Sequence, residues 1–393
     1  MQKLKKGLKL LGKYPLVPAF FVFLFLFSFV DTVKTAQARS ELENRNLTQA
    51  PAFTATAFFS NEWTKAYGEF VRDQFWFRDD WVSLQSALEG AQGKLESSGV
   101  WLAEDGYQIA KNDVWSGAQE RIMPLNTQSV AELAARHPGK VRVMIVPSPA
   151  NIMADKLKAD PPQIDENALT DALLAELEAA GAGVIDLRPI YTEYEAAGKQ
   201  LYYRTDHHWT TTGGARLAYE AFCAAAGRQA VLPDEALRVE VPDFLGTNFA
   251  KTKRPFTQPD TLDYYDLPNP MTIYRLQNNG TLAKETTNIM AYDQLDTFDK
   301  YGAFLHGNNG YSVIEGNGAG SILVVKDSYG NSFVPYLVEN YAKIGVIDLR
   351  AWVDPIDDTI AGDGYDEILV LYSFDSFSQD AYVSRLADSK QEP

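Results

Sequence analysis

Two places in this sequence hold side chains whose types and spacing suit catalysis. The first is the run Asp206-His207-His208-Trp209 within residues 202–214, which contains two of the four histidines of the chain. Imidazole has the side-chain pKa nearest to neutral pH, so the run is suited to proton transfer. It needs a partner, and a nucleophile, a metal ion and a purely structural role are all open at this point.

The second place is Ser328, which follows an apolar run over residues 321–326 that is typical of a buried strand. Gly330 permits a tight turn, and Pro335 suits the first turn of a helix. A serine between a strand and a helix lies at the edge of a sheet, beside the positive end of the helix, where a developing oxyanion is favoured. Such a serine still needs a general base, and the base needs an orienting carboxylate.

The elements that must position these residues have the pattern of an α/β fold. Residues 141–146 form a β-branched run that stops at a proline, a helix is expected over about 168–180, and residues 184–187 read as another strand. Strand, helix and strand at this spacing predict a parallel sheet. Further strands are expected at 321–326, 343–348 and 367–372.

The histidine run is expected in a loop that a helix pins at one end. The threonines at 210–212 are suitable N-caps for an apolar-faced helix that follows them. By contrast, residues 242–320 have no strong period, and we predict an insertion of loops and short strands that flanks the site. The single cysteine, Cys223, lies in a segment typical of a buried helix, so we expect neither a disulfide nor a thiol nucleophile.

The amino-terminal segment predicts a membrane anchor. Residues 16–30 contain six phenylalanines and no charge, and five lysines precede them. About 17 apolar residues are near the shortest span of a bilayer, and the lysines predict a cytoplasmic amino terminus with an external body. A cleaved signal peptide, with Ala36-Gln37-Ala38 as its site, is the alternative. From residue 61 to 91 aromatic residues recur at helical spacing, which predicts helices that pack on the body.

We therefore divide the chain into three parts. Residues 1–39 are a cytoplasmic tail and transmembrane signal-anchor, 40–110 a helical segment, and 111–393 an α/β catalytic domain with an insertion around 242–320. The formal net charge of -16 argues against nucleic acid as a partner, because an acidic body repels phosphates.

Together the motifs resemble those of the bacterial DHHW proteins. These are relatives of the alginate O-acetylation proteins, which are permuted members of the SGNH (GDSL-like) hydrolase superfamily. The resemblance spans roughly residues 40–340, and the blocks that carry it are 40–47, 73–78, 143–147 with 155–157, 202–214, 246–247 with Lys251, 304–308 and 326–329. It implies an SGNH-hydrolase-like parallel sheet flanked by helices, with an N-terminal membrane anchor and a helical segment.

Residue by residue, the Asp-x-His-Trp pattern of the family falls on Asp206, His208 and Trp209, and its nucleophile falls on Ser328. The resemblance thus implies a Ser-His-Asp triad in which His208 is the general base. Two departures from the superfamily are that Lys326 stands where glycine usually precedes Asp-Ser, and that the acid lies two rather than three residues before the histidine. The permuted branch shares both the Asp-x-His spacing and the order of the motifs.

The remaining residues of the site are expected to support the triad. Gly307, Asn308 and Asn309 are the candidate oxyanion donors, through a backbone N–H group and a side-chain amide, and an ordinary Asn-rich turn is the alternative. His207 and Trp209 are expected to hold the loop in place. A metal site is disfavoured because adjacent histidines on one loop rarely both reach one ion, so we expect neither a metal nor another cofactor.

The resemblance implies a membrane-anchored, extracytoplasmic O-acetyltransferase of bacteria that acts on a surface or secreted polysaccharide. The partners implied are a carbohydrate polymer as substrate and a membrane-bound O-acyltransferase as acyl donor. A polysaccharide acetyl esterase with the same triad and a non-catalytic scaffold of an export assembly are the alternatives. Water and a sugar hydroxyl differ only as acceptors of the same acyl group, so the triad does not separate transferase from esterase.

Overall fold

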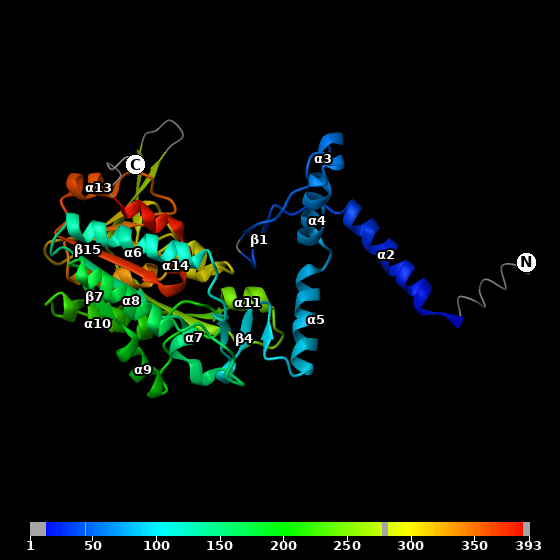
Figure 1. Cartoon of the computed structure of the whole chain (residues 1–393), viewed down its shortest axis with the longest axis horizontal. Coiled ribbons are helices and arrows are strands. Elements are labelled where there is room, and N and C mark those ends of the chain that lie inside the picture. Colours follow the sequence, from blue (N-terminus) through cyan, green and yellow to red (C-terminus); the bar gives the residue numbers. More distant parts are fainter. Residues whose placement is uncertain (1–12, 44, 277–281, 388–393) are drawn as a thin grey trace, which may run out of the picture. The chain divides into compact units, whose positions relative to one another are not determined.

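The computed structural model describes residues 13–43, 45–276 and 282–387 of the chain. The chain forms two compact units, which Figure 1 draws with the labels used below. The first unit comprises Met1–Ala91 with Lys253–Pro255, and the second comprises Gln92–Thr252 with Phe256–Pro393. Four of the five N-terminal lysines, at positions 3, 5, 6 and 9, lie outside the described residues.

Helices make up most of the first unit. They are α2 (Leu16–Val33), α3 (Ala55–Phe59), α4 (Glu62–Gln74) and α5 (Arg78–Ala91), and two short strands, β1 (Arg39–Ser40) and β2 (Arg45–Asn46), pair antiparallel. The helical spacing predicted for residues 61–91 is confirmed by α4 and α5. Aromatic rings join α2 to these helices, because the ring of Phe27 lies 5.5 Å from that of Phe75 and 6.0 Å from that of Trp81.

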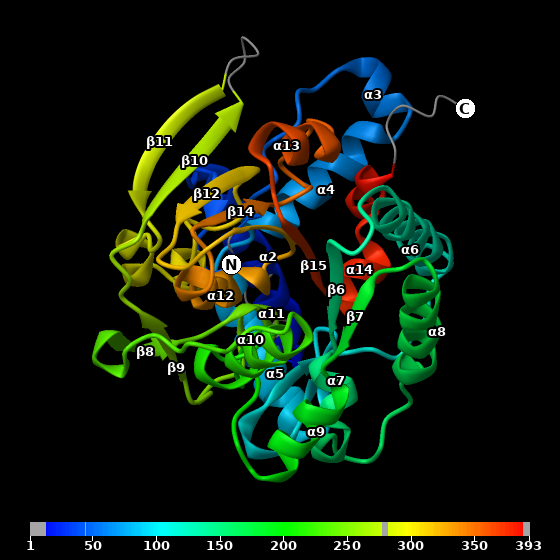
Figure 2. The ribbon, with the colours of Figure 1, turned by 90° about the vertical axis from the view of Figure 1, so that its left-hand side faces the viewer.

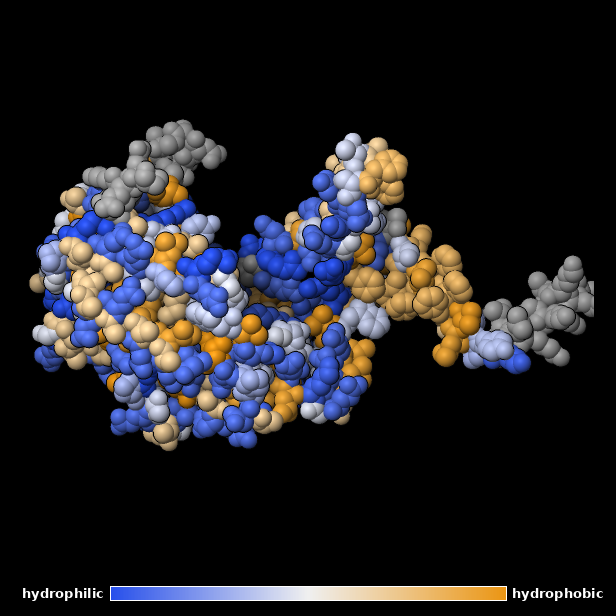
Figure 3. Space-filling model, in the orientation of Figure 1, coloured by the Kyte–Doolittle hydropathy of each residue, from blue (hydrophilic) through white to orange (hydrophobic). Residues whose placement is uncertain are grey.

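Helix α2 covers the apolar segment in which the sequence predicts a membrane anchor. Much of its apolar surface is exposed, as Figure 3 shows. Near its end, the carboxylate of Asp31 accepts a 3.1 Å hydrogen bond from the backbone N–H of Trp76. Over the described ranges, however, no helix is long and apolar enough to cross a membrane. The predicted transmembrane signal-anchor is therefore not supported.

The second unit is built on an eight-stranded sheet with the order β11-β10-β12-β14-β13-β15-β6-β7 (Figure 2). Five neighbouring strands are parallel: β14 (Lys343–Ile347), β13 (Ser321–Lys326), β15 (Glu367–Ser373), β6 (Val141–Val146) and β7 (Gly183–Asp186). All five lie within a residue or so of the ranges expected from the sequence, so the predicted parallel strands are confirmed.

The sheet is nevertheless mixed, which corrects the prediction of a parallel sheet. Three antiparallel strands extend one edge: β12 (Tyr311–Glu315), β10 (Pro270–Leu276) and β11 (Leu282–Asn288). They come from the segment predicted to form loops and short strands. The outermost strand, β11, is exposed along nearly its whole length, so it lacks the apolar alternation from which a strand is usually recognised.

Helices cover both faces of the sheet and pack their buried apolar side chains against it. Alternate residues of β13 point to opposite sides: Ile322 and Val324 belong to one buried cluster, and Leu323 and Val325 belong to another. The first cluster also holds residues of α7 (Pro149–Ile152), α9 (Arg188–Ala196), α10 (Arg216–Ala225) and α12 (Gly330–Phe333). The second holds residues of α6 (Gln119–Arg136), α8 (Glu166–Ala179), α13 (Ile356–Asp363) and α14 (Phe374–Gln379). Helix α8 confirms the helix expected over residues 168–180, and Cys223 is buried in α10.

Smaller elements complete the second unit. Strands β3 (Glu96–Ser97), β4 (Val100–Leu102) and β5 (Gln108–Ala110) form a three-stranded sheet, and β8 (Arg238–Phe244) pairs with β9 (Asp260–Tyr265). Helix α11 (Thr247–Thr252) follows β8. Its first residue contacts the histidine run, as described below.

Candidate active site

Ser328 lies just beyond the carboxyl end of β13, in the middle of the sheet. The strand ends at Lys326, and α12 begins at Gly330, so the serine occupies the turn that the sequence predicts. Its neighbours Asp327 and Tyr329 are buried, whereas Ser328 itself is half-buried. The turn thus presents the hydroxyl at the carboxyl edge of the parallel strands, where ligands bind in open α/β sheets.

The helix after the serine ends before Pro335, which the sequence predicts to lie in the first turn of a helix. Helix α12 has four residues and continues as a tighter 3₁₀ segment, η7 (Val334–Glu339), with Pro335 near its start. Proline lacks the N–H that a continuing α-helix would need at that position. The macrodipole of so short a helix is small, so this helix by itself contributes little to binding an anion at the turn.

The histidine run is held in a closed loop before α10. Tyr202 and Trp209 form an isolated antiparallel bridge, and the N–H of Tyr203 donates to the carbonyl of His208 at 3.1 Å. The predicted cap is confirmed at Thr210, whose hydroxyl accepts the N–H of Gly213 at 3.1 Å. This cap starts a π-helical turn that leads into α10, so the end of the loop has a fixed position.

The three predicted triad residues form one hydrogen-bonded chain. Ser328 Oγ lies 2.7 Å from His208 Nε2, and His208 Nδ1 lies 2.5 Å from Asp206 Oδ1. A carboxylate only accepts hydrogen bonds, so Nδ1 carries the proton and Nε2 is left to accept the serine O–H. This is the arrangement in which an imidazole acts as general base toward a hydroxyl.

Several donors keep Asp206 ionised although it is buried. Burial alone would raise the pKa of its carboxyl, but the imidazoles of His207 and His208 and the N–H of Thr247 hold the pKa well below its usual range. The Thr247 N–H donates to Asp206 Oδ2 at 2.7 Å, and the His208 N–H donates to Oδ1 at 2.9 Å. The adjacent Gly246 leaves room for this carboxylate, because a Cβ there would lie 2.2 Å from the Cβ of Asp206.

An aromatic ring that the sequence did not single out packs on the general-base candidate. Tyr301, in the 3₁₀ segment η6 (Lys300–Ala303), stacks on the ring of His208 with centroids 3.8 Å apart and planes 11° apart. Its hydroxyl donates to the carbonyl of Ser328 at 3.2 Å and lies 3.0 Å from Ser332 Oγ. Tyr301 therefore contacts both the imidazole and the serine segment. It lies in the aperiodic part of the sequence, where no pattern marks it.

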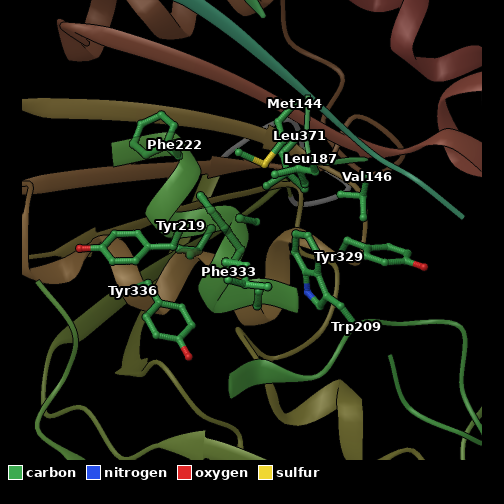
Figure 4. Close-up of a cluster of buried hydrophobic side chains, with 14 of the residues drawn as sticks. Met144, Val146, Leu187, Trp209, Tyr219, Phe222, Tyr329, Phe333, Tyr336 and Leu371 are labelled. Atoms are coloured by element: carbon green, nitrogen blue, oxygen red, sulfur yellow. The ribbon is translucent and has the colours of Figure 1, made fainter. Parts of the chain in front are cut away.

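The two residues expected to support the loop differ in their surroundings. Trp209 is fully buried, its indole N–H donates to Ser332 Oγ at 2.8 Å, and Figure 4 shows it in one cluster with Tyr329 and Phe333. His207 is half-buried, and its Nδ1 lies 2.6 Å from Thr247 Oγ1. Burial and the neighbouring His208 lower the pKa of His207, so its ring is neutral at neutral pH.

The three candidate oxyanion donors have different hydrogen-bond partners. The N–H of Gly307 donates to the carbonyl of Phe304 at 3.0 Å, and Asn309 Nδ2 donates to the carbonyl of Leu305 at 2.6 Å. Both groups are thus used inside the turn. Asn308 is exposed, and its Oδ1 accepts hydrogen bonds from Lys326 Nζ at 3.0 Å and Asn331 Nδ2 at 3.2 Å. Among the residues that the structure describes, its own Nδ2 has no acceptor, so this amide can still donate.

The loop that carries Asn308 has strained backbone geometry. Leu305, His306 and Gly307 have successive φ angles of 55°, 56° and 78°. Two of these residues are not glycine, and left-handed backbone at such residues is uncommon and clusters at functional sites. His306 Nε2 lies 2.9 Å from the carbonyl oxygen of Asn288, which ties the loop to the end of β11.

Asp206, His207 and His208 are also close enough to be considered as metal ligands, since one ligand atom of each lies within 4.8 Å of the others. Both ring nitrogens of His208 already have partners, Asp206 and Ser328. An ion bound by His208 would displace one of them. The residues present therefore fit proton transfer to a serine better than metal coordination.

Comparisons with known proteins identify the family and the fold. The sequence model of the family described as DHHW protein matches residues 130–347. A comparison with curated proteins gave no match. A DHHW family protein from Eubacterium siraeum has a similar structure, with a TM-score of 0.54, 21% identity, and coverage of 74% of this chain and 95% of the other.

Two further solved structures align with this chain. Bacillus cereus PatB1 with a sulfonyl adduct aligns with a TM-score of 0.56 and 21% identity over 72% of this chain and 97% of PatB1. The O-acetyltransferase domain of Pseudomonas putida AlgJ aligns with a TM-score of 0.45 and 16% identity over 74% and 99% of the two chains.

Proposed function

Since the chain belongs to the DHHW family, we propose that it is a serine-dependent O-acyltransferase that moves an acetyl group onto a hydroxyl of a carbohydrate polymer. The observation that carries the proposal is the chain of contacts from Asp206 through His208 to Ser328, at 2.5 and 2.7 Å. A hydroxyl that donates to an oriented imidazole is activated for attack on a carbonyl carbon.

The proposal gives each group a role. Ser328 Oγ attacks the carbonyl carbon of the acetyl donor while His208 Nε2 takes the hydroxyl proton. The C=O π pair moves onto the carbonyl oxygen, and the side-chain amide of Asn308 is the donor proposed to bind that oxyanion. Collapse of the tetrahedral intermediate expels the donor alcohol, which receives the proton from His208, and leaves an acetyl ester on Ser328.

The second half of the reaction reverses these roles. A hydroxyl of the acceptor attacks the ester carbon as His208 Nε2 takes its proton, and Ser328 then leaves with that proton restored. Asp206 keeps Nδ1 protonated throughout and stabilises the imidazolium in each half. The identities of the acceptor, a polysaccharide, and of the donor, a membrane-bound O-acyltransferase, rest on the resemblance of the motifs to the alginate O-acetylation proteins.

The test combines labelling with turnover. Sulfonyl fluorides form stable esters with activated serines, and one structure of the structurally similar PatB1 contains a sulfonyl adduct. We expect methanesulfonyl fluoride to add one sulfonyl group to the full chain at Ser328. The Ser328→Ala variant should neither be labelled nor release p-nitrophenol from p-nitrophenyl acetate, while its melting temperature stays within a few degrees of the wild type. Full activity of this variant would exclude the triad.

The acceptor decides between transfer and hydrolysis. The full chain is incubated with p-nitrophenyl acetate and a neutral oligosaccharide, and the products are followed by mass. We expect the sugar to gain one acetyl group. A parallel incubation contains the same sugar already acetylated. Release of acetate from it, without any gain of acetyl by the free sugar, would instead identify an esterase. Binding of sugar without either reaction would favour the scaffold.

A further inference from the structure

The serine segment contains a buried lysine that the reaction described above does not use. Lys326 is 1% exposed, although it lies only two residues before Ser328. Burial lowers the pKa of its ammonium to about 8. Taking an ammonium out of water is costly unless it gains good partners, so a buried Lys326 requires hydrogen-bond acceptors around its Nζ.

Those partners are two amide oxygens and one carboxylate. Lys326 Nζ donates to Asn331 Oδ1 at 2.5 Å and to Asn308 Oδ1 at 3.0 Å, and Asp348 Oδ2 lies 3.7 Å away. Asp348 is itself paired with Arg350 at 2.5 Å. The ammonium is therefore held mainly by the two asparagines.

The turn is shaped to accommodate this side chain. A Cβ at Gly330 would lie 2.6 Å from the Cβ of Lys326 and 2.8 Å from its Cγ. Only a glycine lets the lysine run along the turn toward Asn308 and Asn331. Gly330, two residues after Ser328, thus makes room for Lys326.

These contacts fix which way the Asn308 amide faces. The oxygen and nitrogen of an amide have similar shapes, and its orientation follows from its hydrogen bonds. An ammonium has donors only, and Asn331 Nδ2 is a donor as well, so both select the oxygen of Asn308. The Nδ2 group then faces away from the buried lysine. Asn308 is exposed and Ser328 is half-buried, so both are accessible to a substrate.

We propose that Lys326 is a positioning residue that holds the side-chain amide of Asn308 with its N–H groups toward the acyl oxygen on Ser328. This inference rests on the proposed function, and it assigns to the lysine a role through Asn308 rather than contact with the substrate. Preorganised donors give an oxyanion site its strength, because they need not reorient during the reaction.

The central experiment compares Lys326→Met with Lys326→Gln in the full chain. The two side chains have similar length, but only glutamine carries N–H groups that can donate to Asn308. With p-nitrophenyl acetate, we expect Lys326→Met to lower kcat by about 30-fold with KM changed less than threefold, below the 10²–10³-fold typical of losing an oxyanion donor outright. Lys326→Gln should recover about tenfold of that loss. Equal kcat values for the two variants would overturn the proposal.

A double-mutant cycle tests whether the lysine acts through Asn308. In an Asn308→Ala background, Lys326→Met should change kcat by less than about twofold, because the group it positions is gone. The same 30-fold loss in that background would show that Lys326 acts on its own, and would overturn the proposal. Asn308→Asp should match Asn308→Ala, since a carboxylate keeps the contact with Lys326 but has no N–H to donate.

A sulfur substitution separates positioning from general damage. Sulfur accepts hydrogen bonds poorly, so the wild type should turn over a thionoester much more slowly than the corresponding ester. This preference, the ratio of kcat for the ester to kcat for the thionoester, should fall at least threefold in Lys326→Met. The matched control is Lys253→Met in the first unit, which removes another buried ammonium, paired with Glu43 at 2.6 Å. It should lower the melting temperature and leave the preference unchanged. An unchanged preference in Lys326→Met would overturn the inference about the lysine. If the wild type turned over no ester at all, the proposed function would be overturned instead.

Discussion

The serine segment and the histidine loop hold their reacting groups by different means. Residues 327–332 follow a central strand, and their side chains are tied by buried hydrogen bonds: Asp327 accepts from Ser373, for example, at 2.7 Å. Residues 206–209 form a loop outside the sheet, and the imidazole of His208 depends on one carboxylate and one stacked ring. The serine is thus placed by a strand of the sheet, whereas the imidazole, on a loop that backbone hydrogen bonds close, is oriented by the side chains of Asp206 and Tyr301. Substitutions around His208 should therefore reduce activity more than stability.

The sharpest test of this comparison is Asp206→Asn. The asparagine oxygen can still accept the Thr247 N–H, so the loop should fold, but its amide no longer requires a proton on His208 Nδ1. Nε2 would then carry the proton and could not accept one from Ser328. We expect kcat to fall about 10⁴-fold, as for loss of the correct tautomer in other triads, with a small change in melting temperature. A loss below tenfold would mean that the loop does not depend on this carboxylate.

Gly246→Ala should displace the same carboxylate, that of Asp206, by a substitution on a neighbouring segment of backbone. Its methyl group would lie 2.2 Å from the Cβ and 2.3 Å from Oδ2 of Asp206, so the carboxylate must move. We expect kcat to fall about 100-fold, since small misplacements of catalytic groups cost that much, and stability to fall by about 1–3 kcal/mol. Enzyme assay and urea unfolding measure the two effects.

The matched control for that variant is Gly362→Ala in α13. No heavy atom lies within 4 Å of a Cβ built there, and the residue is helical, so alanine should stabilise the chain slightly and leave kcat unchanged. If both alanines had the same effect on kcat, the close approach of Gly246 to Asp206 would have no catalytic meaning.

The contrast between the two regions also explains what the sequence could and could not predict. Strand β13 and the turn at Ser328 produce strong local signals, a β-branched run followed by glycine, and the cap at Thr210 is equally local. Contacts between distant segments have no such signal. The approach of Gly246 to Asp206 and the stacking of Tyr301 on His208 join residues about 40 and 90 positions apart, and Gly246 and Tyr301 both lie in the segment 242–320, which has no strong period.

Chemical type alone leaves two features of the site undetermined. Asn308 and Asn309 are identical residues side by side, yet the Asn309 side chain is bonded within the turn while Asn308 faces Lys326. A lysine at the end of a strand reads as solvent-exposed, because burying an ammonium is rare without partners. Its partners, Asn308 and Asn331, lie on either side of it in the sequence, and only the fold brings the three together.

Tyr301 gives a test of intermediate size, because its ring and its hydroxyl contact different regions. Tyr301→Phe keeps the ring on His208 and removes the hydrogen bonds to the serine segment, so kcat should fall about threefold. Tyr301→Leu also removes the stacked ring, worth about 0.5–1.5 kcal/mol, and should lower kcat by a further three- to tenfold. Equal kcat values for the two variants would show that the ring does not orient the imidazole. The melting temperature of each variant controls for general loss of packing.

The smallest effect is expected at His207, the neighbour of the general-base candidate. Its ring contacts Thr247 rather than Ser328, and its lowered pKa keeps it neutral between pH 6 and 9. His207→Gln retains a group that can bond to Thr247 Oγ1, so we expect kcat to fall less than about fivefold. A group whose pKa already lies below the assayed range cannot shape the pH profile, so kcat/KM between pH 6 and 9 should keep its midpoint in this variant. A shifted midpoint would show that His207 shares the proton-transfer role, and that the whole loop, not His208 alone, acts as the base.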